Sequence, residues 1–223
     1  MYATWRAPSP SGIVEERALV LGTRRTVRLL LIPPLFAEHN LTRHQWVEVM
    51  RRLDRAGIDC VCPDLPGVND SLAPLSDQTL AGWRSAVETA ATHFAATHVL
   101  AIRGGTLLVP PALPAFVYAP VKGSRILRAM LRARIVAAQE AGRVERLDEL
   151  TESGRRDGST LGGYAIGPAM FAELETAMPS VEHARPIEQV ELGGSPLWLR
   201  AEPSDDPEQA DALAALLAVE LTG

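Results

Sequence analysis

Cysteine is nearly absent from this chain, since its 223 residues contain only Cys60 and Cys62. Their spacing, two residues apart, places both thiols on one face of an expected strand, where neighbouring cysteines rarely form a disulfide. No second pair of thiols is present to complete a zinc site. We therefore expect two small, buried, apolar side chains in a reducing compartment, and neither a disulfide nor a metal or other cofactor.

The chain also lacks an excess of positive charge and any long apolar run. It has 22 Lys and Arg against 27 Asp and Glu, a formal net charge of −5, whereas a nucleic-acid-binding domain is strongly basic. No run of about 18 apolar residues is present to span a membrane. Residues 1–10 contain no apolar segment long enough for a secretory signal. We expect a cytoplasmic protein that binds no nucleic acid and has no membrane span.

What the chain does have is enough apolar residues, 47%, to bury one sizeable core. Short apolar runs alternate with amphipathic segments, and this order predicts βαβ units and a mostly parallel sheet. One helix is expected to begin at a capping box of Thr42 and Gln45 and to end at Gly57. The expected strands are 17–21, 26–32, 59–62, 98–103, 115–118 and 196–201, and further helices are expected at 80–95, 124 onward, 168–178 and 207–221.

Ligands of parallel sheets bind at the carboxyl ends of the strands, which directs attention to the loops after Ile32, Cys62 and Arg103. The third loop has the register of a nucleophile elbow, G-x-S-x-G, in which a strained strand-to-helix turn carries the nucleophile. Here it reads Ala101-Ile-Arg-Gly-Gly105. We expect the turn to keep its shape without its chemistry, and three prolines in 106–114 exclude a full helix after it.

The helix from residue 124 carries Arg125, Arg128 and Arg132 along its polar side. Such a stripe is either a solvated face or a site for an anion or a partner.

The three loops each carry a short motif. The first has Pro33, Pro34, Phe36, Glu38 and Asn40, followed by Arg43; the second has Asp64, Gly67, Asp70 and Ser71; the third has Arg103 and Gly105. This ordered series resembles the second hydrolase family associated with the exosortase A system, with one inserted residue in the first loop and with Asn69 replacing a glycine in the second. The chain resembles a divergent, shortened member.

This resemblance implies a three-layer α/β-hydrolase-like fold over residues 1–223, as a single domain. It also implies a reduced cap, with a cap-like helical excursion at about 124–180, and a shortened C-terminal end. Members of the family sit in exopolysaccharide and protein-sorting loci.

A conventional hydrolase of this fold needs a nucleophile, an acid and a histidine in that order along the chain. No histidine follows His183, and His39 and His44 lie in the first loop, away from the position of a triad base. The remaining catalytic candidates are Ser71, Asp70 and Glu38. Asp70-Ser71 after Pro-Gly is also typical of a turn or a helix cap.

Arg103 has two interpretations. Its guanidinium could bind a carboxylate or phosphate bidentately at the mouth of the sheet. Alternatively it forms an ion pair with Glu38 or Asp70 that holds the loops together, and both hold if a ligand displaces the carboxylate. The candidate ligand-binding residues are Arg103, Glu38, Asn40, Arg43, Asp64 and Asp70.

Three functions are consistent with these residues. The first is a hydrolase homologue without serine-hydrolase activity that binds a partner or a small anionic ligand in exopolysaccharide- or exosortase-linked metabolism. The second is an active esterase or thioesterase that acts on an acyl ester through non-standard residues among Glu38, Asp70, Ser71 and Arg103. The third is a subunit of a hetero-oligomeric hydrolase, and a homo-oligomer is a further arrangement to consider.

Overall fold

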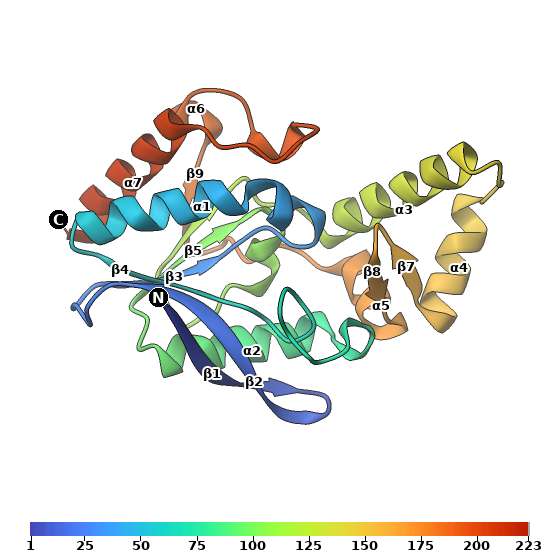
Figure 1. Ribbon diagram of the computed structural model, residues 1–223, viewed down its shortest axis with the longest axis horizontal. Coiled ribbons are helices and arrows are strands. Elements are labelled where there is room, and N and C mark those ends of the chain that lie inside the picture. The colour runs from blue at the N-terminus through green and yellow to red at the C-terminus, as the bar shows by residue number, and fades with distance from the viewer. Residues whose placement is uncertain (223) are drawn as a thin grey trace.

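The centre of the molecule is a seven-stranded, mostly parallel sheet with helices on both faces (Figure 1). The computed structural model describes residues 1–222. The strand order is β1-β2-β4-β3-β5-β6-β9. The strands are β1 (Tyr2–Ser9), β2 (Gly12–Leu21), β3 (Arg28–Ile32), β4 (Asp59–Pro63), β5 (His98–Ile102), β6 (Ala115–Tyr118) and β9 (Ala184–Ile187). β1, β2 and β4 pair antiparallel, and the pairs from β4 to β9 are parallel.

Two apolar cores lie on the two faces of this sheet, because successive side chains of a strand point to opposite sides. In β3, Leu29 and Leu31 face α1 (Ala37–Arg55) and α7 (Pro207–Thr222), while Leu30 and Ile32 face α2 (Leu80–His93). All four leucine and isoleucine side chains are buried. The expected three-layer α/β class with a mostly parallel sheet is confirmed.

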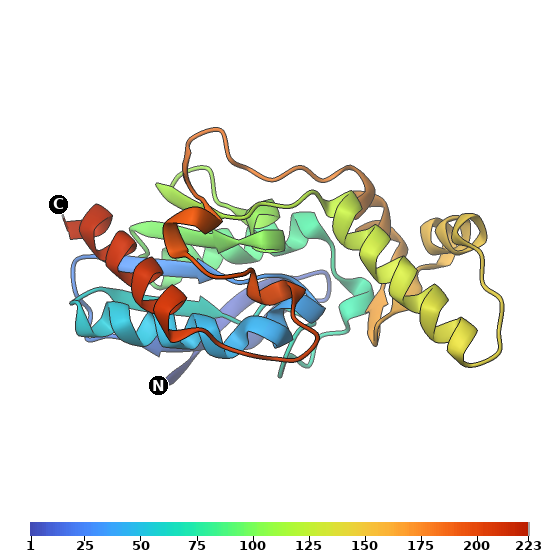
Figure 2. The same ribbon diagram turned by 90° about the horizontal axis from the view of Figure 1, so that it is seen from above.

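Residues 123–176 extend sideways from the sheet (Figure 2). This part contains α3 (Gly123–Glu140), α4 (Leu147–Asp157), the hairpin of β7 (Ser159–Leu161) and β8 (Tyr164–Ile166), and α5 (Pro168–Thr176). The remaining short elements are the 3-10 turns η1 (Leu75–Asp77), η2 (Arg103–Leu108) and η3 (Leu197–Leu199) and the helix α6 (Gln189–Leu192). Arg125, Arg128 and Arg132 lie exposed on α3.

Three sequence-based expectations about the elements are wrong. Residues 2–9 form an edge strand that was absent from the expected strands; Trp5 and Ala7 are buried there, and Pro8 is tolerated at the edge, where its missing N–H costs little. Residues 196–201 form the turn η3 and not the last strand. The last strand is β9, which the pattern concealed because it contains Arg185 and Pro186.

The third error concerns the start of α1, which begins at Ala37, before the expected capping box. Thr42 is interior to the helix: its Oγ1 donates to the Glu38 carbonyl at 2.7 Å and accepts from Trp46 Nε1 at 2.7 Å. Gln45 binds the backbone N–H and C=O of Asp206, at 2.8 and 3.1 Å. These two polar residues are buried ties between elements and not a cap.

Cys60 is buried, as expected, whereas Cys62 is only partly buried; both are free thiols. Burial raises the pKa of the Cys62 thiol to about 12. Within residues 1–222, no helix is both long enough and apolar enough to pass through a membrane.

Candidate functional site

The turn after β5 keeps the strained geometry expected of an elbow. Arg103 has a φ of +52°, a region that non-glycine residues rarely adopt. Gly105 is required because a Cβ at this position would collide with the carbonyl oxygens of Ile32 and Pro33. The six-residue turn η2 follows in place of a full helix, which confirms the expectation drawn from the prolines.

The Arg103 guanidinium contacts a carboxylate, a backbone carbonyl and an aromatic ring. Its Nε and Nη2 donate to the two carboxylate oxygens of Glu38 at 3.0 and 2.8 Å, and its Nη1 donates to the Ala119 carbonyl at 3.3 Å. The guanidinium carbon lies 4.7 Å from the centre of the Trp198 ring. Only 15% of the Arg103 side chain and 28% of the Glu38 side chain are exposed. An anion that bound this guanidinium bidentately through Nε and Nη2 would have to displace Glu38.

Ser71 stabilises the loop after β4. Its Oγ accepts hydrogen bonds from the backbone N–H of Gly67 at 2.8 Å and Ala73 at 3.2 Å, and donates to Glu16 Oε1 at 2.6 Å. Burial raises the pKa of Glu16. A hydroxyl with two N–H donors and an acceptor in place has the environment of a turn-forming serine, and no histidine is among these partners.

The other expected ligand-binding residues do not converge on Arg103. Asp70 pairs with Arg17 at 3.1 Å, with both side chains mostly exposed. Asp64 accepts a hydrogen bond from the Asn69 amide, and burial raises the pKa of its carboxyl. Asn40 Nδ2 donates to the Tyr164 hydroxyl at 3.0 Å.

Arg43 lies beside His39 and Asp64 at a small cavity of about 20 Å³. Of the expected set, only Glu38 therefore meets Arg103.

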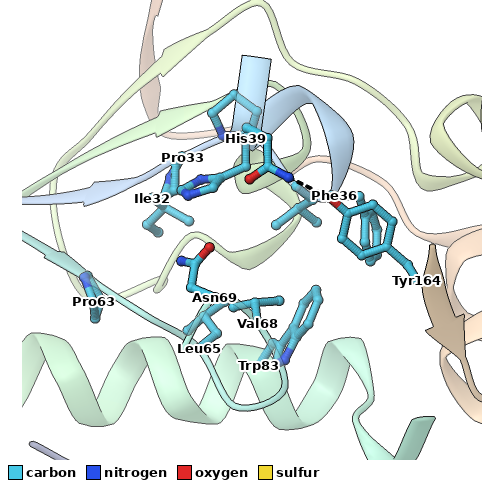
Figure 3. A pocket seen from close by; sticks show the side chains of 13 residues that line it. Ile32, Pro33, Phe36, His39, Pro63, Leu65, Val68, Asn69, Trp83 and Tyr164 are labelled. Carbon is cyan, nitrogen blue, oxygen red and sulfur yellow. Dashed lines mark hydrogen bonds between the residues drawn. The ribbon is translucent and has the colours of Figure 1, made fainter. Parts of the chain in front are cut away.

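A pocket of about 190 Å³ lies between the loops after β3 and β4 (Figure 3). Its lining includes no aspartate, glutamate, lysine or arginine. The lining residues are Ile32, Pro33, Pro34, Leu35, Phe36, His39, Asn40, Pro63, Leu65, Val68, Asn69, Trp83 and Tyr164. Arg103 and Ser71 are not among them, so the pocket is lined neither by the residue at the elbow nor by the candidate serine.

Three aromatic rings form one wall of the pocket. The Phe36 ring centre lies 5.8 Å from Trp83 and 5.4 Å from Tyr164, in tilted and edge-on arrangements that suit aromatic pairs. Trp83 is fixed by its Nε1, which donates to the Pro66 carbonyl at 2.9 Å. Tyr164 comes from β8, so the laterally extended part of the chain contributes to the pocket.

Two pocket residues hold positive φ angles, +56° at Phe36 and +51° at Asn69. For a bulky residue such as phenylalanine this conformation is a genuine outlier. Strained backbone of this kind often marks ligand-binding and active sites. The strained backbone is therefore a second feature, independent of the pocket's volume, that is typical of a ligand-binding site.

His39 lines this pocket and also the small cavity beside Arg43. Its Nε2 is buried and is the only such side-chain atom without a hydrogen-bond partner in residues 1–222. Burial, and secondarily the charge of Arg43, lowers its pKa to about 4. The imidazole is therefore neutral at pH 7.

The sequence motifs included Phe36, Asn40 and Asn69. They did not identify His39, Trp83 or Tyr164 as residues of the pocket. His39 lies within the first matched loop, and its position just after the carboxyl end of a parallel strand was the available signal. Trp83 and Tyr164 come from a helix and a hairpin far along the chain, so no local pattern placed either of them at this pocket.

Solved structures resemble this chain along nearly its whole length. No protein-family model and no curated protein matches the sequence. A protein of Agrobacterium vitis S4 that has been proposed to be a hydrolase is 11% identical, with 99% of this chain and 98% of that chain covered and a TM-score of 0.61. Rv0554 from Mycobacterium tuberculosis is 12% identical, with 98% and 97% covered and a TM-score of 0.54.

A hydrolase from Pseudomonas aeruginosa PA01 is 13% identical, with 97% and 98% covered and a TM-score of 0.54. The chain has the α/β-hydrolase fold. At these identities the likeness establishes the fold alone, because one fold supports many chemistries. In this chain Arg103 lies on the strained turn directly after β5.

Proposed function

We propose that this chain is a member of the α/β-hydrolase fold without serine-hydrolase activity, and that it binds a small, uncharged, largely apolar molecule. The ligand would occupy the pocket formed by Phe36, Trp83 and Tyr164. The observation that carries the proposal is that a well-formed apolar pocket exists apart from the elbow arginine. Sites of this kind, apolar with a few polar groups, are typical of small-molecule binding.

The absence of hydrolysis follows from the residues at the conventional positions. Arg103 cannot act as a nucleophile, Ser71 is engaged by two N–H groups and Glu16, and no histidine follows His183. Removing the nucleophile or the base of such a triad costs about 10⁶-fold in kcat. An esterase or thioesterase that uses non-standard residues has no geometric support from the partners of Ser71, Asp70 and Glu38.

The size of the pocket limits the ligand. An apolar cavity of about 150 Å³ holds one benzene molecule, so about 190 Å³ accommodates a single ring with one or two substituents. The lack of a charged lining residue favours an uncharged ligand over the anionic one expected from Arg103 alone.

The biological setting is proposed from the loops that resemble the exosortase-associated family. Residues 31–40 and 64–71, which carry that resemblance, also supply most of the pocket lining. A function in exopolysaccharide- or exosortase-linked metabolism is proposed on that resemblance alone.

Two measurements test the proposal. First, treatment with a fluorophosphonate probe followed by mass spectrometry should give no adduct, and short acyl esters and thioesters should not turn over. Second, isothermal titration calorimetry with toluene should detect binding with a Kd on the order of 1 mM or tighter, which is about −4 kcal/mol. A stoichiometric serine adduct, or no toluene binding, contradicts the corresponding half of the proposal.

A pair of valine substitutions locates the binding. Val68 is a half-buried residue of the pocket wall. Val68→Trp should fill the pocket and abolish toluene binding. Val190→Trp adds the same side chain at a position that is 87% exposed and remote from the pocket lining, and should leave binding unchanged. Equal affinities in both variants would place the toluene elsewhere.

A further inference from the structure

We infer that the outer face of α3 docks on a membrane surface that contains anionic lipids. Arg125, Arg128 and Arg132, spaced by about one turn, form an arginine stripe along this face. The lining of the apolar pocket contains no residue of α3, so this surface is separate from the proposed ligand site.

The outer face of α3 carries charge of one sign only. Between Gly123 and Ala137, its exposed residues are the three arginines of the stripe, alanines and Val136. A helix face that is only solvated usually carries charges of both signs. On α1, for example, Arg51 and Arg52 both pair with Glu48. The composition of α3 therefore indicates a partner of opposite charge.

The charge of the arginine stripe is not neutralised within the molecule. No ion pair of residues 1–222 includes an arginine of the stripe. In the same laterally extended part, Arg134 pairs with Glu145 and Arg155 pairs with Glu175. The chain as a whole has a net charge of −5. An anionic surface would be attracted to this face and repelled by the rest of the chain, which fixes the orientation of docking.

The outer end of α3 favours a lipid surface over an acidic protein. Val136, Val144 and Leu147 are exposed there, and Val144 is 89% exposed. Figure 1 and Figure 2 both show the loop between α3 and α4 at the outer end of the molecule, away from the sheet. Apolar side chains at such a tip enter the headgroup region of a bilayer, and arginines bind phosphate groups bidentately. The stripe and the tip together match the two layers of an anionic lipid surface.

The test measures co-sedimentation of the full chain with phosphatidylcholine vesicles that contain or lack phosphatidylglycerol. The wild-type protein should bind only the vesicles with phosphatidylglycerol, and a high concentration of NaCl should release it. Arg125→Gln, Arg128→Gln and Arg132→Gln together should weaken binding about 100-fold, because each cation near an anionic surface contributes about 5-fold.

The matched control is the triple variant Arg6→Gln, Arg24→Gln and Arg55→Gln. These arginines are also exposed, lie outside residues 123–176 and take part in no ion pair of residues 1–222. The net charge changes equally in both triple variants, but the control should bind within about 3-fold of wild type, since its substitutions lie away from the bilayer.

A second pair of variants tests the tip. Val144→Asp should weaken binding about 5-fold, because it places a carboxylate against the anionic surface. Val190→Asp adds the same charge on α6, at a side chain that is 87% exposed, and should bind as wild type.

A wild-type protein that does not bind the anionic vesicles overturns the inference, and this measurement needs no variant. Equal binding by the two triple variants, or by the two aspartate variants, overturns it as well. Binding to polyglutamate and not to anionic vesicles would assign the stripe to an acidic protein instead of a membrane. Toluene binding tests the pocket separately from all these measurements.

Discussion

Replacing Arg103 with methionine should destabilise the fold and leave ligand binding intact. Methionine keeps an unbranched side chain at the same backbone position, so the cost of the positive φ is similar in both proteins. The substitution removes both hydrogen bonds to Glu38 and the contact with Trp198, and it leaves a mostly buried carboxylate without its partner.

The magnitude follows from these contacts. Breaking a buried pair by removing one partner costs about 3–5 kcal/mol, and the partial exposure of Glu38 reduces this cost. The cation–π contact adds about 0.5–1 kcal/mol. We therefore expect Arg103→Met to lower the free energy of unfolding by about 2–4 kcal/mol, measured by urea denaturation.

A matched control and a double-mutant cycle sharpen the measurement. Arg17→Met removes an exposed ion pair with Asp70 and should change stability by less than about 0.5 kcal/mol. A cycle of Arg103→Met with Glu38→Gln should give a coupling energy above about 1 kcal/mol. The reasoning is refuted if Arg103→Met is as stable as Arg17→Met, or if it loses toluene binding while it keeps its stability; Arg103 would then be a ligand-binding residue.

Three further predictions concern single residues. Arg103→Ser should show no esterase activity above wild type on short acyl esters, because no histidine follows the last strand, β9, to act as the base of a serine at the elbow. Ser71→Ala should lower stability by about 1–2 kcal/mol in urea denaturation, because two N–H groups and Glu16 lose their partner; an unchanged midpoint would contradict the turn role.

Acid should weaken the fold through His39. Its pKa is lowered to about 4 in the folded protein, so the unfolded chain, with a pKa of about 6.5, binds the proton first. The free energy of unfolding therefore decreases by about 2–3 kcal/mol as the pH falls from about 6.5 toward 4. His39→Phe should remove that part of the loss between pH 7 and 4.5; parallel wild-type and variant curves would show that His39 does not contribute.

The elements that could be predicted from the sequence are those whose burial produces a local pattern of apolar residues. Residues 29–32 and 99–102 read as continuous apolar runs because both faces of these strands are covered. Leu197-Trp-Leu199 also reads as a strand, but Trp198 lies over Arg103 instead of in the sheet. That contact joins residues 95 positions apart in the chain, and no local pattern records it.

The start of α1 shows why the candidate site was predicted only in part. The loop after β3 was expected to present Glu38 and Asn40 as ligand-binding residues, with His39 between them in the same loop. These residues instead form the first turn of a helix, where successive side chains diverge by about 100°. Glu38 therefore meets Arg103, His39 borders the pocket, and Asn40 meets Tyr164. One short motif is divided among three structural roles.

The positive φ angles show how the strain of this fold is distributed. Phe36, Asn69, Arg103 and Ala119 each hold one, and each lies in the segment that follows one of four parallel strands. Such a conformation costs about 1–3 kcal/mol and persists where the surroundings impose it. At the elbow the strained residue is Arg103, and this conformation places its side chain against Glu38 and the Ala119 carbonyl. At Phe36 and Asn69 the same strained conformation shapes the pocket. The pocket therefore lies between the loops after β3 and β4 and not at the turn that holds Arg103.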